Sequence, residues 1–106
     1  MVPVTGGPHP AGVTLHLVQS SGAALGDCLA HCTAGDGILL LGAGVVCLAA
    51  KDVDGLSPDG VALYCLLADL QARGLSGTAA AGPWQPVDDT HFPLLLERYR
   101  HCVSWK

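Results

Sequence analysis

Five short apolar segments, separated by segments of helical character, constrain the fold of this chain more than any other feature. Residues 38–41 read Ile-Leu-Leu-Leu without polar alternation, which is typical of a strand buried on both faces. Strict alternation of strands and helices with short connections predicts a mostly parallel sheet covered by helices on both faces. We therefore expect a single small three-layer α/β domain with about five strands, broadly flavodoxin-like.

The expected elements follow in order along the chain. We expect strands over residues 13–18, 38–41, 61–66, 84–87 and 103–105. We expect a first helix capped by residues 20–21 and running to about residue 33, helices over residues 43–51 and 68–73, and a last helix capped by Asp88 or Asp89 and running to about residue 101. Pro86 confines its strand to an edge or a strand end. Residues 1–12 are rich in Gly and Pro, so we expect a flexible lead-in there, with the domain spanning residues 13–106.

The composition favours a protein that associates with others. Half of the 106 residues are hydrophobic and only 13% are charged. A small domain with so few charges exposes apolar patches, and such patches usually mark protein contacts. The net charge is −4, and the first fifty residues contain no Lys or Arg, which argues against direct binding of nucleic acid.

The same sequence argues against a membrane or secreted protein. No basic residue precedes a hydrophobic run near the N-terminus, so no secretory signal is indicated. The longest apolar run, residues 38–50, is too short to span a bilayer. We expect a cytoplasmic protein, in which the five cysteines remain thiols.

Cys28 is the candidate catalytic residue. Cys28 and Cys32 form one apolar stripe of the expected first helix with Leu25 and Leu29, and both could be simple core residues. The helical angle places Cys32 near the centre of the stripe and Cys28 near its edge. Because partial exposure permits reactivity, we expect Cys28 to be the more reactive thiol.

Neither a metal nor a cofactor is expected. A zinc site would need ligands at closable spacings, but His31 points away from the cysteine stripe and no C-x-x-C exists. The turn at residues 42–44 reads Gly-Ala-Gly and lacks the third glycine of a dinucleotide fingerprint. Cys47 and Cys65 lie in apolar runs and are expected to pack in the core. Cys102 is expected to be inert beside His101.

The order of motifs from Leu63 onward resembles the TusB/DsrH family. The motifs are Leu63-Tyr64-Cys65-Leu66, Asp69-Leu70-Gln71-Ala72-Arg73-Gly74-Leu75, Pro86-Val87-Asp88-Asp89-Thr90-His91-Phe92, Leu94-Leu95-Leu96 and Val103-Ser104-Trp105. Members of the family often carry an Asp at the position of Ala43. Some members also carry a cysteine in the first helix, at the place of Cys28.

The resemblance implies a non-catalytic or accessory subunit of a cytoplasmic persulfide sulfur-relay complex. Its partners would be homologous TusC/DsrF-like and TusD/DsrE-like subunits in a heterohexamer that exchanges sulfur with persulfide carrier proteins. The main active cysteine would belong to a partner. The relay would serve 2-thiolation of the tRNA wobble uridine or dissimilatory sulfur oxidation. Two alternatives remain: a stand-alone thiol sulfurtransferase using Cys28, and a small-ligand-binding module on a flavodoxin-like sheet.

Overall fold

A computed structural model describes residues 14–49, 60–75, 77 and 84–105. Its elements are β1 (Thr14–Val18), α1 (Ala23–His31), β2 (Gly37–Leu40), the 3₁₀ helix η1 (Gly42–Ala49), β3 (Ala62–Leu66), α2 (Leu67–Ala72), β4 (Gln85–Val87), α4 (Phe92–Glu97) and β5 (His101–Trp105). The lead-in predicted over residues 1–12 lies outside the described residues.

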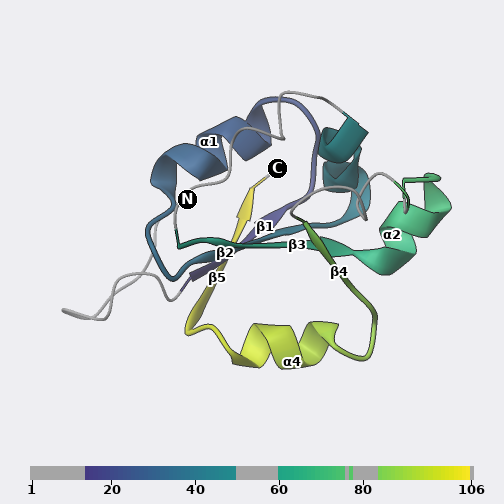
Figure 1. The fold of residues 1–106 in the computed structure, drawn as a ribbon. Coiled ribbons are helices and arrows are strands. Elements are labelled where there is room, and N and C mark those ends of the chain that lie inside the picture. Colours follow the sequence, from purple (N-terminus) through teal and green to yellow (C-terminus); the bar gives the residue numbers. More distant parts are fainter. Residues whose placement is uncertain (1–13, 50–59, 76, 78–83, 106) are drawn as a thin grey trace.

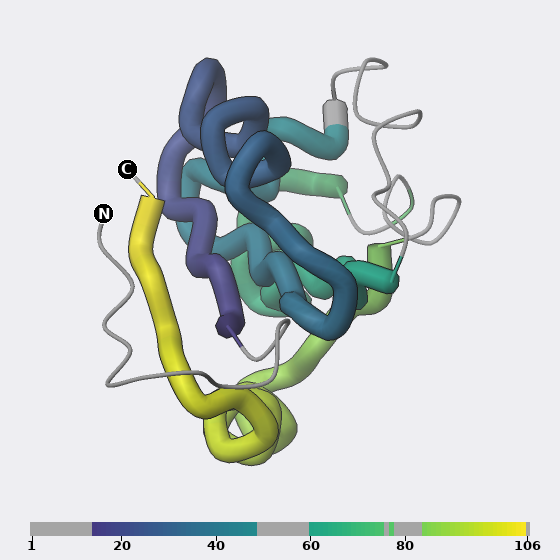
Figure 2. Tube along the Cα trace, turned by 90° about the vertical axis from the view of Figure 1, so that its left-hand side faces the viewer, coloured from purple at the N-terminus to yellow at the C-terminus, as the bar shows by residue number. Residues whose placement is uncertain are grey.

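The five strands form one parallel sheet in the order β4-β3-β2-β1-β5. Strands β1 to β4 lie side by side in sequence order, and β5 returns to the far side of β1. Figure 2 shows β5 (yellow) running alongside β1 (purple). The flavodoxin-like order is 2-1-3-4-5, so the sheet shares the class but not the strand order. The predicted edge position of the strand that contains Pro86 is confirmed.

Helices cover the sheet on both faces, which confirms the predicted three-layer α/β domain. Helix α1 lies over one face, with η1 and α2 packed in the same core, and α4 lies over the other face (Figure 1). Two separate hydrophobic clusters result, one on each side of the sheet. In the part of the chain that the structure describes, the second face is covered by a six-residue helix alone.

Strand β2 shows why the continuous apolar run predicts a central strand. All four of its residues are buried. Ile38 and Leu40 point into the cluster beneath α1, whereas Leu39 points into the cluster beside α4. Alternate side chains of one strand therefore fill both cores.

The predicted ends of the first and last helices were wrong. Helix α1 begins only at Ala23 because Gly22 adopts a φ of 90°, which a right-handed helix cannot continue. Helix α4 ends at Glu97 rather than near residue 101, and His101 already belongs to β5. Residues 101–105 form a strand because β5 pairs in parallel with β1. The pattern of apolar residues within one segment of the sequence does not show that pairing.

Gly44 explains the glycine-containing turn after β2. A Cβ atom at this position would collide with the carbonyl oxygen of Val18 at the end of β1. The Gly44 N–H donates to the carbonyl of Leu41 at 2.9 Å. The turn thus allows η1 to approach the sheet closely, which is a packing role and requires no phosphate.

Candidate functional site

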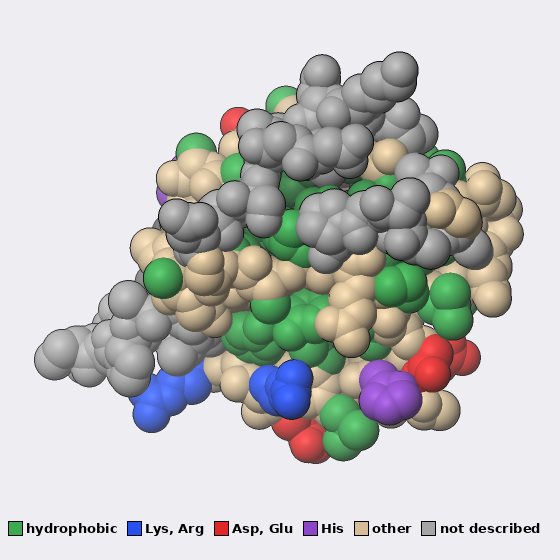
Figure 3. All heavy atoms as spheres, in the orientation of Figure 1, with side chains coloured by type: hydrophobic (Ala, Val, Ile, Leu, Met, Phe, Trp, Pro, Cys, Tyr) green, Lys and Arg blue, Asp and Glu red, His purple; other side chains and the backbone are tan. Residues whose placement is uncertain are grey.

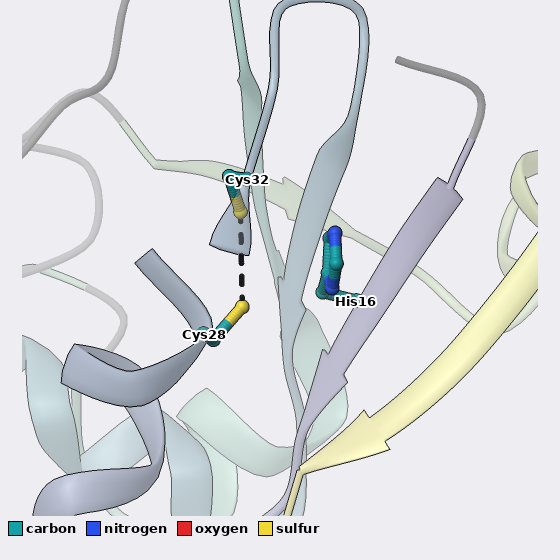
Figure 4. Close-up of side chains that lie close together, drawn as sticks. All are labelled: His16, Cys28 and Cys32. Atoms are coloured by element: carbon teal, nitrogen blue, oxygen red, sulfur yellow. Dashed lines mark hydrogen bonds between the residues drawn. The ribbon is translucent and has the colours of Figure 1, made fainter. Parts of the chain in front are cut away.

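The side chains of His16, Cys28 and Cys32 meet between the sheet and α1 (Figure 4). His16 projects from the middle of β1, Cys28 from the last turns of α1, and Cys32 from the residue that ends the helix. Their ligand-type atoms all lie within 4.8 Å of one another. The two Sγ atoms are 3.9 Å apart. Three chemically reactive groups therefore share one small volume.

Asp36, the residue just before β2, holds His16 in place. Its Oδ2 atom lies 3.0 Å from Nε2 of His16, and both side chains are about 95% buried. The same carboxylate accepts hydrogen bonds from the backbone N–H groups of Thr14 and Thr33, each at 3.1 Å. A buried carboxylate must be satisfied in this way, and the shared acceptor ties β1, β2 and the end of α1 together.

Trp105 determines which nitrogen of His16 carries a proton. The indole N–H of Trp105 lies 3.1 Å from Nδ1 of His16. An indole N–H can only donate, so Nδ1 must be the acceptor and the proton of the neutral ring resides on Nε2, facing Asp36. The ring of His31 also rests against Trp105, with centroids 5.3 Å apart.

The two thiols have opposite acid–base behaviour. The hydrogen bond from Cys28, supported by His16, lowers the pKa of Cys32 to about 5. The pKa of Cys28 is raised, because its proton is held by Cys32 and because burial disfavours the thiolate. Burial by itself would lower the pKa of His16, but its interactions with Cys32 and Asp36 outweigh burial and raise it. Cys32 is therefore the thiolate and Cys28 the thiol that donates to it.

The expected order of exposure of the two cysteines was wrong. Cys28 is 0% exposed, whereas Cys32 is only partly buried. The helical angle does not predict the exposure of Cys32, because the helix has already ended at this residue. The backbone of Cys32 is extended, with φ −75° and ψ 145°. Whether Cys28 reacts stays a prediction, but the partly exposed and more acidic thiol is Cys32.

His16 and Trp105 were missed as site residues in the sequence. The only signal for His16 is a polar residue in the centre of an apolar strand, and it has no recognisable spacing from Cys28. In the sequence, Trp105 stood out only as part of the Val103-Ser104-Trp105 motif. The structure brings it to His16 across 89 residues of sequence.

The same three side chains are the best candidates for holding a metal ion among the described residues. Two thiolates and an imidazole suit zinc. Both ring nitrogens of His16 are already engaged, however, one by Asp36 and the other by Trp105. Metal binding would have to break one of these hydrogen bonds, so the observed arrangement supports thiol chemistry better.

The remaining cysteines lie elsewhere. Cys47 and Cys65 are buried in the core, which confirms their predicted packing role. Cys102 is exposed, and its pKa is raised by partial burial. It follows His101 in β5, where successive side chains point to opposite faces of the sheet.

A cavity of about 500 Å³ lies on the opposite side of the sheet, between β4 and α4. Its lining combines apolar and charged groups: Tyr64, Leu67, Gln85, Pro86, Val87, Asp88, His91, Leu94, Leu95 and Arg98. The Asp88 carboxylate at its rim accepts hydrogen bonds from Thr90 and His91, which lower its pKa to about 2. Asp88 thereby organises the turn that leads into α4.

Fold and site together define a small parallel α/β domain that carries a paired thiol site against a buried histidine. Residues 19–101 match the family described as DsrH like protein. The chain belongs to the DsrH family, which confirms the resemblance seen in the sequence and assigns it, at the level of the family, to the accessory proteins of sulfur relay. No curated protein matches the sequence. Among the described residues, no helix is long and apolar enough to cross a membrane.

Proposed function

We propose that this chain is an accessory subunit of a cytoplasmic persulfide sulfur-relay complex, built with homologous TusC/DsrF-like and TusD/DsrE-like subunits as a heterohexamer. The relay serves tRNA wobble-uridine 2-thiolation or dissimilatory sulfur oxidation. The observation that carries this proposal is the DsrH family match over residues 19–101, which includes both thiols of the site.

The thiol site supports a role in handling sulfur. A persulfide forms when a thiolate attacks a sulfane sulfur, so the acceptor needs a low pKa and access to its donor. Cys32 has both properties, and Cys28 lies next to it. Cys28 thus keeps its proposed place in the site, as the partner of Cys32.

The surface around α4 supports association with homologous subunits. Figure 3 shows hydrophobic side chains gathered in the middle of one face, with basic, acidic and His side chains along its lower edge. Leu94 on α4 is 57% exposed. Several other hydrophobic side chains on the α4 side of the sheet are only partly buried: Leu17, Leu41, Tyr64, Phe92, Leu96 and Tyr99. An apolar surface with a charged border is typical of a protein contact.

Coexpression tests the proposal. The chain is expressed with a DsrE-like and a DsrF-like subunit, and the purified product is analysed by native mass spectrometry. We expect one mixed species with two copies of each subunit. A chain that remains a lone, stable monomer in the presence of both homologues would contradict the proposal.

A stand-alone thiol sulfurtransferase is the second candidate, favoured by the low pKa of Cys32. It predicts that the purified chain alone moves sulfur from a small persulfide donor to an acceptor such as cyanide with repeated turnover. The accessory role predicts that turnover requires the partner subunits.

A further inference from the structure

We propose that Cys28 and Cys32 form a dithiol–disulfide pair that discharges a persulfide held on Cys32 as hydrogen sulfide. The proposal rests on the proposed function, because it takes the persulfide as the substrate. It adds a reductive step, in which the protein releases the sulfur that it carries as hydrogen sulfide.

The geometry carries the first part of the inference. The Sγ atoms are 3.9 Å apart without a bond, close to van der Waals contact and within reach of the disulfide length of about 2 Å after a small movement. Figure 4 shows both side chains directed toward each other from the end of α1 and the segment that follows.

The local backbone allows that movement. Cys32 lies just beyond the last residue of α1, and its N–H makes a long hydrogen bond of 3.4 Å to the carbonyl of Leu29. Cys28 is fixed within the helix and fully buried. The exposed member of the pair can therefore approach the buried member without unwinding the helix.

The difference in exposure divides the chemistry between the two sulfurs. Cys32 is accessible to a persulfide donor and receives the sulfane sulfur, whereas Cys28 has no exposed surface from which to meet a donor protein. Cys28 can react only with what Cys32 brings to it. That restriction makes Cys28 the resolving thiol.

The step balances without an outside oxidant. The sulfur of Cys28 attacks the inner sulfur of the Cys32 persulfide, the bond between Cys32 and the outer sulfur breaks, and the outer sulfur leaves as HS⁻. The proton of the Cys28 thiol ends on the departing sulfide, giving hydrogen sulfide. The sulfane sulfur is reduced to sulfide, and the two cysteines are left as a disulfide. A dithiol reductant returns them to thiols.

His16 contributes to this step as a positioning residue. Its ring is fixed by Asp36 and Trp105, so the atoms beside Cys32 keep their places while a sulfur atom is added and removed. The interaction of His16 with Cys32 also stabilises negative charge on that side of the pair.

The test treats the reduced full-length chain with glutathione persulfide and removes excess reagent. Intact mass, sulfide release and peptide mapping are then followed in time. We expect one equivalent of sulfide, a final product lighter by two hydrogens, and a peptide that links Cys28 to Cys32. Persulfidated Cys32 should be seen only transiently.

Cys28→Ser and Cys28→Ala are the informative variants, and Cys102→Ser is the matched control. Both Cys28 variants should retain the added sulfur on Cys32 and release at least tenfold less sulfide, whereas the control should behave like the original chain. A stable Cys32 persulfide in the original chain, or sulfide release without the Cys28–Cys32 link, would overturn the proposal. If the variants fail to fold, the products of the original chain alone distinguish these outcomes.

Assembly with the homologous subunits is measured in parallel by native mass spectrometry. If the chain assembles but keeps its persulfide, the result contradicts this inference and agrees with the proposed function. If the chain releases sulfide but never assembles, the result agrees with this inference and contradicts the proposed function.

Discussion

The indole N–H of Trp105 donates a 3.1 Å hydrogen bond to Nδ1 of His16, which joins the last strand of the sheet to the first. This bond leaves Nε2 as the protonated nitrogen of the neutral ring, and Asp36 receives that proton's hydrogen bond at 3.0 Å. The family match begins at residue 19 and ends at residue 101, so both His16 and Trp105 lie outside it. Cys28 and Cys32 therefore lie within the segment that matches the family, whereas His16, which lies beside them, is outside it.

Cys32 should be the fastest thiol to alkylate at acidic and neutral pH. Its lowered pKa of about 5 means that the thiolate persists as the pH falls and is lost only near pH 5. The rate with iodoacetamide should be half-maximal near pH 5, whereas that of Cys102 should still rise above pH 9, because its pKa is raised. Peptide mass spectrometry measures both in one sample. Equal rates for the two thiols at pH 6 would refute the assignment.

His16→Gln should raise the pKa of Cys32. The interaction with His16 helps to lower the pKa of Cys32, so its loss should move the alkylation profile of Cys32 to higher pH. The glutamine amide can still donate to Asp36, which limits structural damage. His91→Gln, on the opposite side of the sheet, is the control and should leave the profile unchanged. An identical profile in His16→Gln would show that His16 does not act on the thiolate.

Gly44→Ala and Gly26→Ala should change stability in opposite directions. An added Cβ at Gly44 collides with the Val18 carbonyl, so we expect a loss of about 1–3 kcal/mol in the free energy of unfolding. Gly26 lies in α1 with no heavy atom near a new Cβ, and alanine there should stabilise the helix by about 0.5–1 kcal/mol. Urea denaturation measures both. A neutral Gly44→Ala would mean that η1 does not need its close approach to β1.

Leu94→Glu should prevent or weaken assembly with the homologous subunits. Leu94 is 57% exposed on α4, so a charge there disturbs an apolar contact but little of the monomer's own core. Val46→Glu is the matched control, because Val46 is 40% exposed on η1, which packs on the other face of the sheet. Native mass spectrometry of the coexpressed subunits gives the readout. Assembly lost equally in both variants would argue against a specific α4 surface.

A chelator should not change the reactivity of Cys32. Both nitrogens of His16 are engaged, so we expect the thiol pair to work without a metal ion. The alkylation rate of Cys32 is compared before and after treatment with EDTA and 1,10-phenanthroline. A rate that rises after chelation, with zinc found in the untreated protein, would replace the thiol assignment with a metal site.

The sheet could be predicted from the sequence because its signals are local. The apolar run of residues 38–41 marks the central strand, and Pro86 marks the edge strand. Gly74, with a φ of 67°, follows α2 as expected of a glycine after a helix. The boundary between α4 and β5 could not be predicted in this way, because β5 is defined by its partner β1 and not by its own pattern.

The site was only half visible in the sequence for a related reason. Cys28 and Cys32 share one helical segment, so their proximity follows from spacing. Their relative exposure depends on where the helix ends, and it ends at His31, one residue before Cys32. His16 and Asp36 meet because β1 and β2 are neighbours in the sheet, which no local pattern shows.

The position of β5 beside β1 has a consequence for how this protein matures. Contacts between residues so distant in sequence form late in folding, because a long loop must close first. We expect the hydrogen bond from Trp105 to be among the last to form, so that Nδ1 of His16 has no indole partner until then. Until β5 docks, Asp36 alone would hold the ring of His16, so the histidine's contribution to the low pKa of Cys32 would be complete only in a molecule that has closed its sheet.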